Sequence, residues 1–98
     1  MQVTSGGQDF EIRNITLNSS TDTPVDFNQH LNSAILKCRT SVDVYIRRTS
    51  GDSNYFTIPA GGSLSLDVAF TDTAQGGYIL CWARSASTTP VLEVIGSF

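Results

Sequence analysis

Residues 63–70 read SLSLDVAF, which is the most regular stretch of this 98-residue sequence. Large apolar residues occupy every second position, and small or acidic residues stand between them. Side chains of a β-strand point alternately to its two faces, so this period of two predicts a strand with one core-facing side. We therefore expect Leu64, Leu66, Val68 and Phe70 to point inward.

The same alternation appears before this stretch. Residues 34–39 and 42–47 both alternate, and only Thr40 and Ser41 separate them, which predicts a tight hairpin or a bulge. Residues 55–58 are aromatic and β-branched, and Pro59 ends them because proline cannot donate to a strand ladder.

Two further strands are predicted after it. Residues 78–84 carry apolar side chains on both faces, which is typical of a central strand or of one whose outer face meets another subunit. Residues 91–95 form the last predicted strand. The glycine pairs at 61–62 and 76–77 precede no helix pattern, so they indicate turns and not phosphate loops.

The first third of the chain has a weaker pattern. Residues 10–17 suggest a strand whose phase breaks near Asn14, as at a bulge, and residues 18–32 suggest a loop with one short strand around 24–27. Six to eight short strands without a helical pattern predict an all-β fold, an antiparallel β-sandwich or a small jelly-roll-like barrel. At this length residues 1–98 form a single domain.

The period-two phase also predicts the core. It places Phe10, Phe56 and Phe70 on core-facing phases, and it puts Cys38 and Cys81 toward the same interior. In a reducing compartment the two cysteines are expected to be buried as small apolar side chains; the alternative is that they form a disulfide. The predicted core includes Leu36, Val44, Ile46, Phe56, Ile58, Leu64, Leu66, Val68, Ile79 and Val94.

Charge and hydropathy restrict the classes of partner. The net charge of −3 and the pI of about 4.7 argue against a nucleic-acid partner, because binding phosphates needs a basic face. No apolar stretch approaches the ~20 residues that cross a bilayer, so we expect no membrane partner. Residues 1–7 lack the basic and apolar regions of a secretory signal, and we expect the chain to be made in the cytoplasm of its producer.

The sequence offers no catalytic set. His30 is the only histidine, and it lies in a polar loop without cysteine or carboxylate partners at metal-ligand spacing. The aspartates are scattered over turns and outer strand positions. We therefore expect a protein that is not an enzyme, with no catalytic, cofactor-binding or metal-binding residues and no cofactor.

Four aromatic residues fall on the opposite phase of their strands: Tyr45, Tyr55, Tyr78 and Trp82. A second sheet or a long loop covers them, or they form an exposed aromatic strip. Exposed aromatic residues are the usual anchors for sugars and for protein interfaces. These four residues are the candidate interface.

Three segments carry a resemblance to known proteins. Residues 35–46 (ILKCRTSVDVYI), 55–64 (YFTIPAGGSL) and 91–95 (VLEVI) resemble small structural proteins of tailed bacteriophages. The resemblance implies a virion component made in the host cytoplasm, namely a β-sandwich decoration or cement protein. Such a protein binds the major capsid protein and stabilises the shell, and the family offers no catalytic residues to carry over.

The segment before the first strand suggests a second contact. Residues 1–9 are polar and are expected to form an extended arm that reaches an adjacent subunit. Shell surfaces present identical sites around symmetry axes, so we expect a homo-oligomer, with a trimer as the first guess. The alternative is a carbohydrate-binding or adhesion sandwich of a tail fibre or lectin type; an enzyme ranks third.

Overall fold

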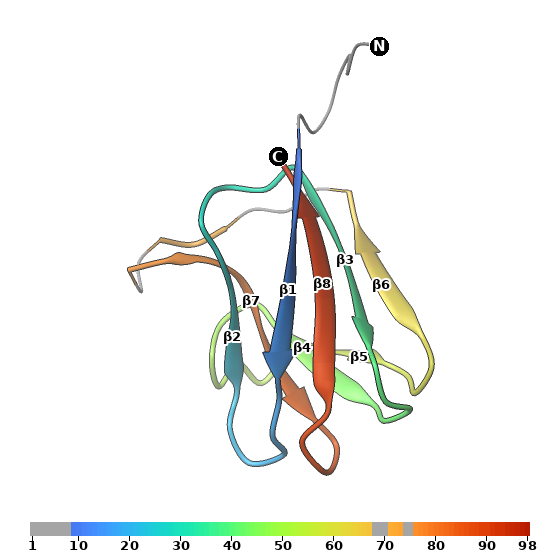
Figure 1. Ribbon diagram of the computed structural model, residues 1–98. Coiled ribbons are helices and arrows are strands. Elements are labelled where there is room, and N and C mark those ends of the chain that lie inside the picture. The colour runs from blue at the N-terminus through green and yellow to red at the C-terminus, as the bar shows by residue number, and fades with distance from the viewer. Residues whose placement is uncertain (1–8, 68–70, 74–75) are drawn as a thin grey trace.

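The computed structural model describes residues 9–67, 71–73 and 76–98, which fold into two packed antiparallel β-sheets (Figure 1). The front sheet has the strand order β1-β8-β3-β6, and the back sheet has the order β2-β7-β4-β5. The strands are β1 (Phe10–Thr16), β2 (Thr23–Phe27), β3 (Ser33–Cys38), β4 (Val44–Arg47), β5 (Phe56–Ile58), β6 (Ser63–Leu66), β7 (Tyr78–Ser85) and β8 (Val91–Ser97).

The strand order is that of a jelly roll. Strands β1 to β4 alternate between the two sheets, and β5 to β8 return to the sheets in reverse order. Eight strands in two four-stranded sheets with this winding define the jelly-roll sandwich. The prediction of an all-β sandwich of six to eight strands is confirmed, and β7 is a central strand as its two apolar faces indicate.

The expected hairpin at Thr40 and Ser41 is wrong. Strand β3 pairs with β6 and β8, whereas β4 pairs with β5 and β7, so the chain crosses from one sheet to the other between them. Alternation fixes which side chains face inward but not which strand is the neighbour, and both segments face the same interior from opposite sheets.

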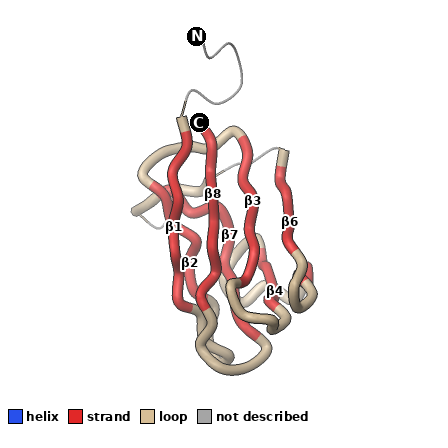
Figure 2. Tube along the Cα trace, turned by 45° about the vertical axis from the view of Figure 1, so that its right-hand side comes forward, coloured by secondary structure: helices blue, strands red, loops and turns tan. Residues whose placement is uncertain are grey.

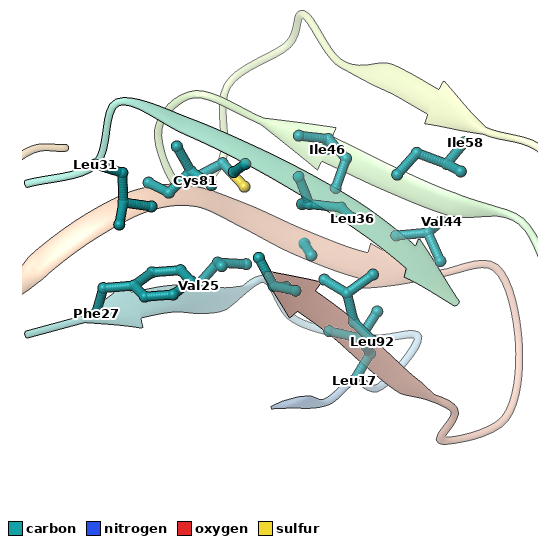
Figure 3. Packing of buried hydrophobic residues seen from close by; sticks show 14 residues of the cluster. Leu17, Val25, Phe27, Leu31, Leu36, Val44, Ile46, Ile58, Cys81 and Leu92 are labelled. Atoms are coloured by element: carbon teal, nitrogen blue, oxygen red, sulfur yellow. The ribbon is translucent and has the colours of Figure 1, made fainter. Parts of the chain in front are cut away.

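The core lies between the sheets (Figure 3). Six predicted core residues are buried, and Leu64 and Leu66 are half-buried against the cluster. Val68 and Phe70 lie outside the described residues, and strand β6 is described as far as Leu66. The six confirmed residues are Leu36, Val44, Ile46, Ile58, Ile79 and Val94.

Phe56 is exposed, so its prediction as a core residue is wrong. It pairs with Ile46 in the β4–β5 register, and Ile46 is buried, so the phase itself is right. Strand β5 is the edge of the back sheet, and at this edge the front sheet does not cover the Phe56 ring. An edge position exposes a side chain that would be buried in a central strand.

Phe10 is also exposed, and strand β1 has no bulge at Asn14. The β1–β8 register is continuous, with Phe10 and Ile12 on the outer face and Ile15 packed against the core. An ion pair between Arg13 Nη2 and Glu11 Oε2 (2.6 Å) occupies the inward positions at this end, where the Arg13 guanidinium also lies 5.9 Å from the Phe27 ring centre.

Both cysteines face the interior, as predicted. Cys81 is buried in the core cluster, and Cys38 is half-buried and packs against the same cluster from the other sheet. Both thiols are free in the structure.

Residues 1–8 of the expected arm lie outside the described residues, but Asp9 is hydrogen-bonded to the end of the front sheet. The Asp9 and Phe98 backbones exchange hydrogen bonds of 3.2 and 3.1 Å, which extend the β1–β8 ladder by one residue pair. An arm therefore includes residues 1–8 at most.

Candidate interaction surfaces

The outer face of the back sheet brings together two of the four predicted aromatic residues. Tyr45 on β4 and Tyr55, just before β5, meet edge to face, with ring centres 5.2 Å apart at 71°. The Arg47 guanidinium lies over the Tyr55 ring, 4.9 Å from the ring centre. We call Tyr45, Arg47 and Tyr55 the aromatic cluster.

A buried carboxylate holds the arginine of this cluster in place. Asp22 Oδ1 accepts hydrogen bonds from Arg47 Nη1 (3.2 Å) and from Arg84 Nε (3.1 Å), and Asp22 Oδ2 accepts one from the Gly51 backbone N–H (2.8 Å). The Asp22 side chain is only 1% exposed. This one carboxylate therefore ties the β1–β2 loop to β4, to β7 and to the β4–β5 loop.

The β4–β5 loop is fixed at a second point. Arg47 Nε donates a hydrogen bond of 2.8 Å to the Asp52 carbonyl oxygen. Gly51 has φ of 76°, in the left-handed region that glycine adopts at little cost, which lets the loop turn back toward Asp22. Tyr55 leaves this loop 53% exposed, although both neighbours of its ring are anchored in the sheet.

Trp82 and Tyr78, the other two predicted residues, do not contact the Tyr55 ring: Trp82 lies beside Arg47 in the sheet, and Tyr78 lies at the opposite end of β7. Trp82 is half-buried on the same sheet face, directly between Pro24 on β2 and Arg47 on β4 in the register. Tyr78 packs against the core and meets the His30 ring edge to face at 4.9 Å, so it is part of the packing at the other end of β7. Alternation predicted the outer face for Trp82, but the outward prediction for Tyr78 is wrong, because the register shift between Val25 and Asp26 pairs Tyr78 with the buried Phe27 on the core side.

A groove lies beside the aromatic cluster, between the edge strands β5 and β6. It has a volume of about 590 Å³. Its floor is apolar and its rim carries Tyr55, Phe56, Arg47 and Arg48. The floor residues are Ile46, Leu64, Leu66, Leu80 and Cys81.

The groove contains one group with altered acidity. Burial raises the pKa of the Cys81 thiol to about 12, and the positive charge of Arg48 opposes this only in part. A thiol with so high a pKa is almost entirely protonated near neutral pH and is a poor nucleophile. Cys81 therefore acts as an apolar lining residue of the groove.

His30, the histidine singled out in the sequence, takes part in loop packing. His30 is exposed, and its Nδ1 shares a hydrogen bond with the buried Thr71 hydroxyl. Among residues 9–67, 71–73 and 76–98, no group of three or more His, Cys, Asp or Glu side chains is placed to hold a metal ion. Within the same ranges, no helix has the length and apolar character needed to span a membrane.

A second surface, which the sequence analysis missed, lies on the outer face of the front sheet. Ile12, Ile35 and Ile95 are exposed there, with Phe10 at the margin. Ile35 and Ile95 share their phase with charged residues in the sequence, whereas the phase predicts that Ile12 faces the core with Phe10, and the adjacency of the three isoleucines depends on the strand order β1-β8-β3.

The structure therefore has two exposed sheet faces suited to binding, one aromatic and one aliphatic. The aliphatic face is built from strand residues, whereas the aromatic cluster combines two residues of β4 with Tyr55 in the loop before β5. Hydrogen bonds to Asp22 and Asp52 hold Arg47 beside the Tyr55 ring. No family model, curated protein or solved structure matches this chain.

Proposed function

We propose that this chain is a non-enzymatic virion structural protein, a capsid decoration or cement protein that binds the major capsid shell in repeated copies and stabilises it. The shell contact is the aromatic cluster together with the groove beside it. The partner is a segment of the shell protein whose apolar side chain enters the groove and whose backbone lies along Tyr55.

The observation that carries the proposal is the state of Tyr55. Tyr55 is 53% exposed, and yet its ring contacts both the Tyr45 ring and the Arg47 guanidinium. Tyrosine and arginine are among the residues that contribute most to binding at protein interfaces. Because the ring is already positioned, little side-chain entropy is lost when a partner covers it.

The shape of the surface favours a protein partner over a sugar. Carbohydrate-binding surfaces need a flat, exposed aromatic platform, whereas Tyr45 and Tyr55 meet at 71° and Trp82 is half-buried. The groove floor is aliphatic, so it offers an apolar side chain a place to be buried but offers few hydrogen bonds to sugar hydroxyls.

The virion setting rests on two weaker supports. Residues 35–46, 55–64 and 91–95 resemble small structural proteins of tailed bacteriophages. The jelly-roll fold occurs in viral capsid proteins and also in lectins, so the fold is compatible with both the proposal and the carbohydrate-binding alternative.

The test is co-sedimentation with undecorated capsid shells of the producing virus. We expect Tyr55→Ala to weaken shell binding by about 30-fold, the loss typical of a central interface tyrosine. The matched control is Thr89→Ala, which truncates an exposed side chain in the β7–β8 loop, outside both exposed sheet faces, and it should change binding less than threefold.

Both variants should keep the wild-type circular dichroism spectrum, since both side chains are exposed. Equal binding by Tyr55→Ala and wild type would contradict the assignment of this face. Absence of wild-type binding, with binding to glycans instead, would favour the carbohydrate-binding alternative.

A further inference from the structure

The outer face of the front sheet carries an unbroken row of isoleucines. The strand registers pair Ile12 on β1 with Ile95 on β8, and Ile95 with Ile35 on β3. These side chains are 60%, 36% and 46% exposed, in that order across the sheet. Strands β1, β8 and β3 lie side by side in Figure 2, so the row crosses three adjacent strands.

The two neighbouring rows differ in character. On one side the register aligns Asn14, Glu93 and Lys37, and Glu93 forms ion pairs with Lys37 (3.7 Å) and Arg39 (2.9 Å). On the other side it aligns Phe10, Ser97 and Ser33. The isoleucine row thus separates a charged row from a row of one phenylalanine and two serines.

The face also has a knob and a hollow on opposite sides of the isoleucine row. Phe10 protrudes with 57% of its surface exposed. A shallow hollow of about 280 Å³ lies between the isoleucine row and the charged row, and its lining includes Ile12, Asn14 and Ile95.

We propose that this face binds the same face of a second copy of the chain, with a two-fold axis along the isoleucine row, across the strands. Rotation about this axis stacks each isoleucine on its own counterpart. It also places Phe10 of one copy over Asn14 of the other, at the hollow. A two-fold contact must be self-complementary, and the knob and the hollow satisfy this requirement twice in one dimer.

The charge of Glu93 favours this axis over a two-fold axis that runs along the strands. A two-fold axis along the strands would place Glu93 of one copy opposite Glu93 of the other, and like charges face to face disfavour association. The axis along the isoleucine row instead places the charged row of each copy over the serine row of its partner. Ser33 and Ser97 can then offer hydroxyl groups to Glu93 and Lys37.

The size of the face predicts a weak dimer. Four strands at ~4.8 Å spacing and seven residues at ~3.4 Å rise give a face of roughly 19 by 24 Å, or about 450 Å² in projection. Stable interfaces bury about 800 Å² per partner. We therefore expect a dimer that dissociates on dilution, and repeated binding to a larger assembly would strengthen it through effective concentration.

Cysteine cross-linking of the purified full chain tests the contact without any shell. In a Cys38→Ala background, Ile95→Cys and Ile12→Cys should each form disulfide-linked dimers under mild oxidation at high protein concentration. Thr57→Cys, an exposed position on the outer face of the back sheet, is the matched control and should cross-link at least tenfold more slowly. Cys81 is buried and present in all variants.

The pattern of cross-links also tests the axis. With the proposed axis Ile12→Cys links to itself, whereas with the axis along the strands it links only to Ile35→Cys in a mixed sample. Analytical ultracentrifugation of the unmodified chain should show a monomer–dimer equilibrium that Ile95→Lys abolishes and Thr57→Lys leaves unchanged.

Three outcomes would overturn the proposal. One is a monomer at all concentrations with no preference of Ile95→Cys over Thr57→Cys. Another is a trimer. The third is a dimer that forms only after residues 1–8 are deleted, which would mean that the N-terminal segment of the same chain covers the face. None of these outcomes bears on shell binding by the aromatic cluster, so the two proposals fail separately.

Discussion

Individual leucines on neighbouring strands differ in how deeply they are buried. Leu36 on β3 is fully buried, while Leu66 on the neighbouring strand β6 is half-buried at the groove. We expect Leu36→Ala to lower the free energy of unfolding by about 3 to 4 kcal/mol, because it leaves an enclosed cavity. Leu66→Ala should cost only about 1 to 2 kcal/mol, because a truncated side chain at an open groove leaves no closed void.

Urea denaturation of the two variants measures this difference. Equal losses would mean that the β5–β6 side of the sandwich is as closed as its centre, which would contradict the open groove.

The two thiols should differ sharply in reactivity. The Cys81 pKa of about 12 makes its thiolate rare at pH 8, so its reaction with a disulfide reagent should be on the order of 10³-fold slower than that of a free cysteine with a pKa of about 8.5. Half-buried Cys38 should react first. One thiol titrated in the native state and two after denaturation is the expected count.

The same pKa shift makes stability depend on alkaline pH. The folded state holds the Cys81 proton more tightly than the unfolded state, so this contribution is complete below pH 9 and is lost as pH rises toward 12. The loss of stability over this range should be smaller in Cys81→Ala than in wild type. Rapid native-state labelling of Cys81 at pH 8 would contradict its burial.

Sequence periodicity predicted the direction of most side chains but not the depth of their burial. Ile46 and Phe56 are register partners with the same phase, and only Ile46 is buried, because Phe56 belongs to the edge strand. On β1 the residues Glu11 and Arg13 occupy inward positions as an ion pair, so the apolar residues Phe10 and Ile12 point outward against expectation.

Among the structural elements, the loops around Asp22 depend on a single carboxylate. Asp22 and Glu93 each pair with two cations, but the Asp22 side chain is 1% exposed and that of Glu93 is 32% exposed. Asp22→Ala should lower the free energy of unfolding by about 2 to 3 kcal/mol, because it leaves Arg47 and Arg84 without their shared partner. Glu93→Ala should cost less than about 1 kcal/mol, as is usual for exposed ion pairs.

Thermal unfolding of this matched pair separates a structural carboxylate from a surface one. Equal melting temperatures of the two variants would mean that Asp22 does not fix the β4–β5 loop. Arg47 would then not be held beside the Tyr55 ring by this carboxylate.

The strands themselves were predictable, whereas their partners were not. Turn residues such as Pro59 and Gly61 mark the strand ends, and Gly61 has the positive φ of 80° that the turn requires. The pairing of β3 with β8 joins segments far apart in the sequence, so no local pattern reveals it. The isoleucine row and the contacts of Asp22 with Arg47 and Arg84 both join residues that are distant in the sequence, which is why the sequence did not predict them.

For the whole molecule, we propose a different partner for each sheet: a shell protein for the aromatic cluster of the back sheet, and a second copy of the chain for the isoleucine row of the front sheet. A jelly roll suits this division because its two sheets present their outer faces in opposite directions (Figure 2). A small sandwich of this kind gains stability when partners cover its exposed apolar side chains.

Electron microscopy of undecorated shells mixed with the purified full-length chain tests the central claim, that the protein binds a capsid shell, most directly. The account predicts added density at symmetry-equivalent sites, with the Tyr55 edge of each sandwich against the shell and weaker occupancy for a chain lacking residues 1–8. Shells with no added density at saturating protein concentration, or sandwiches attached by a face that leaves Tyr55 in solvent, would contradict it.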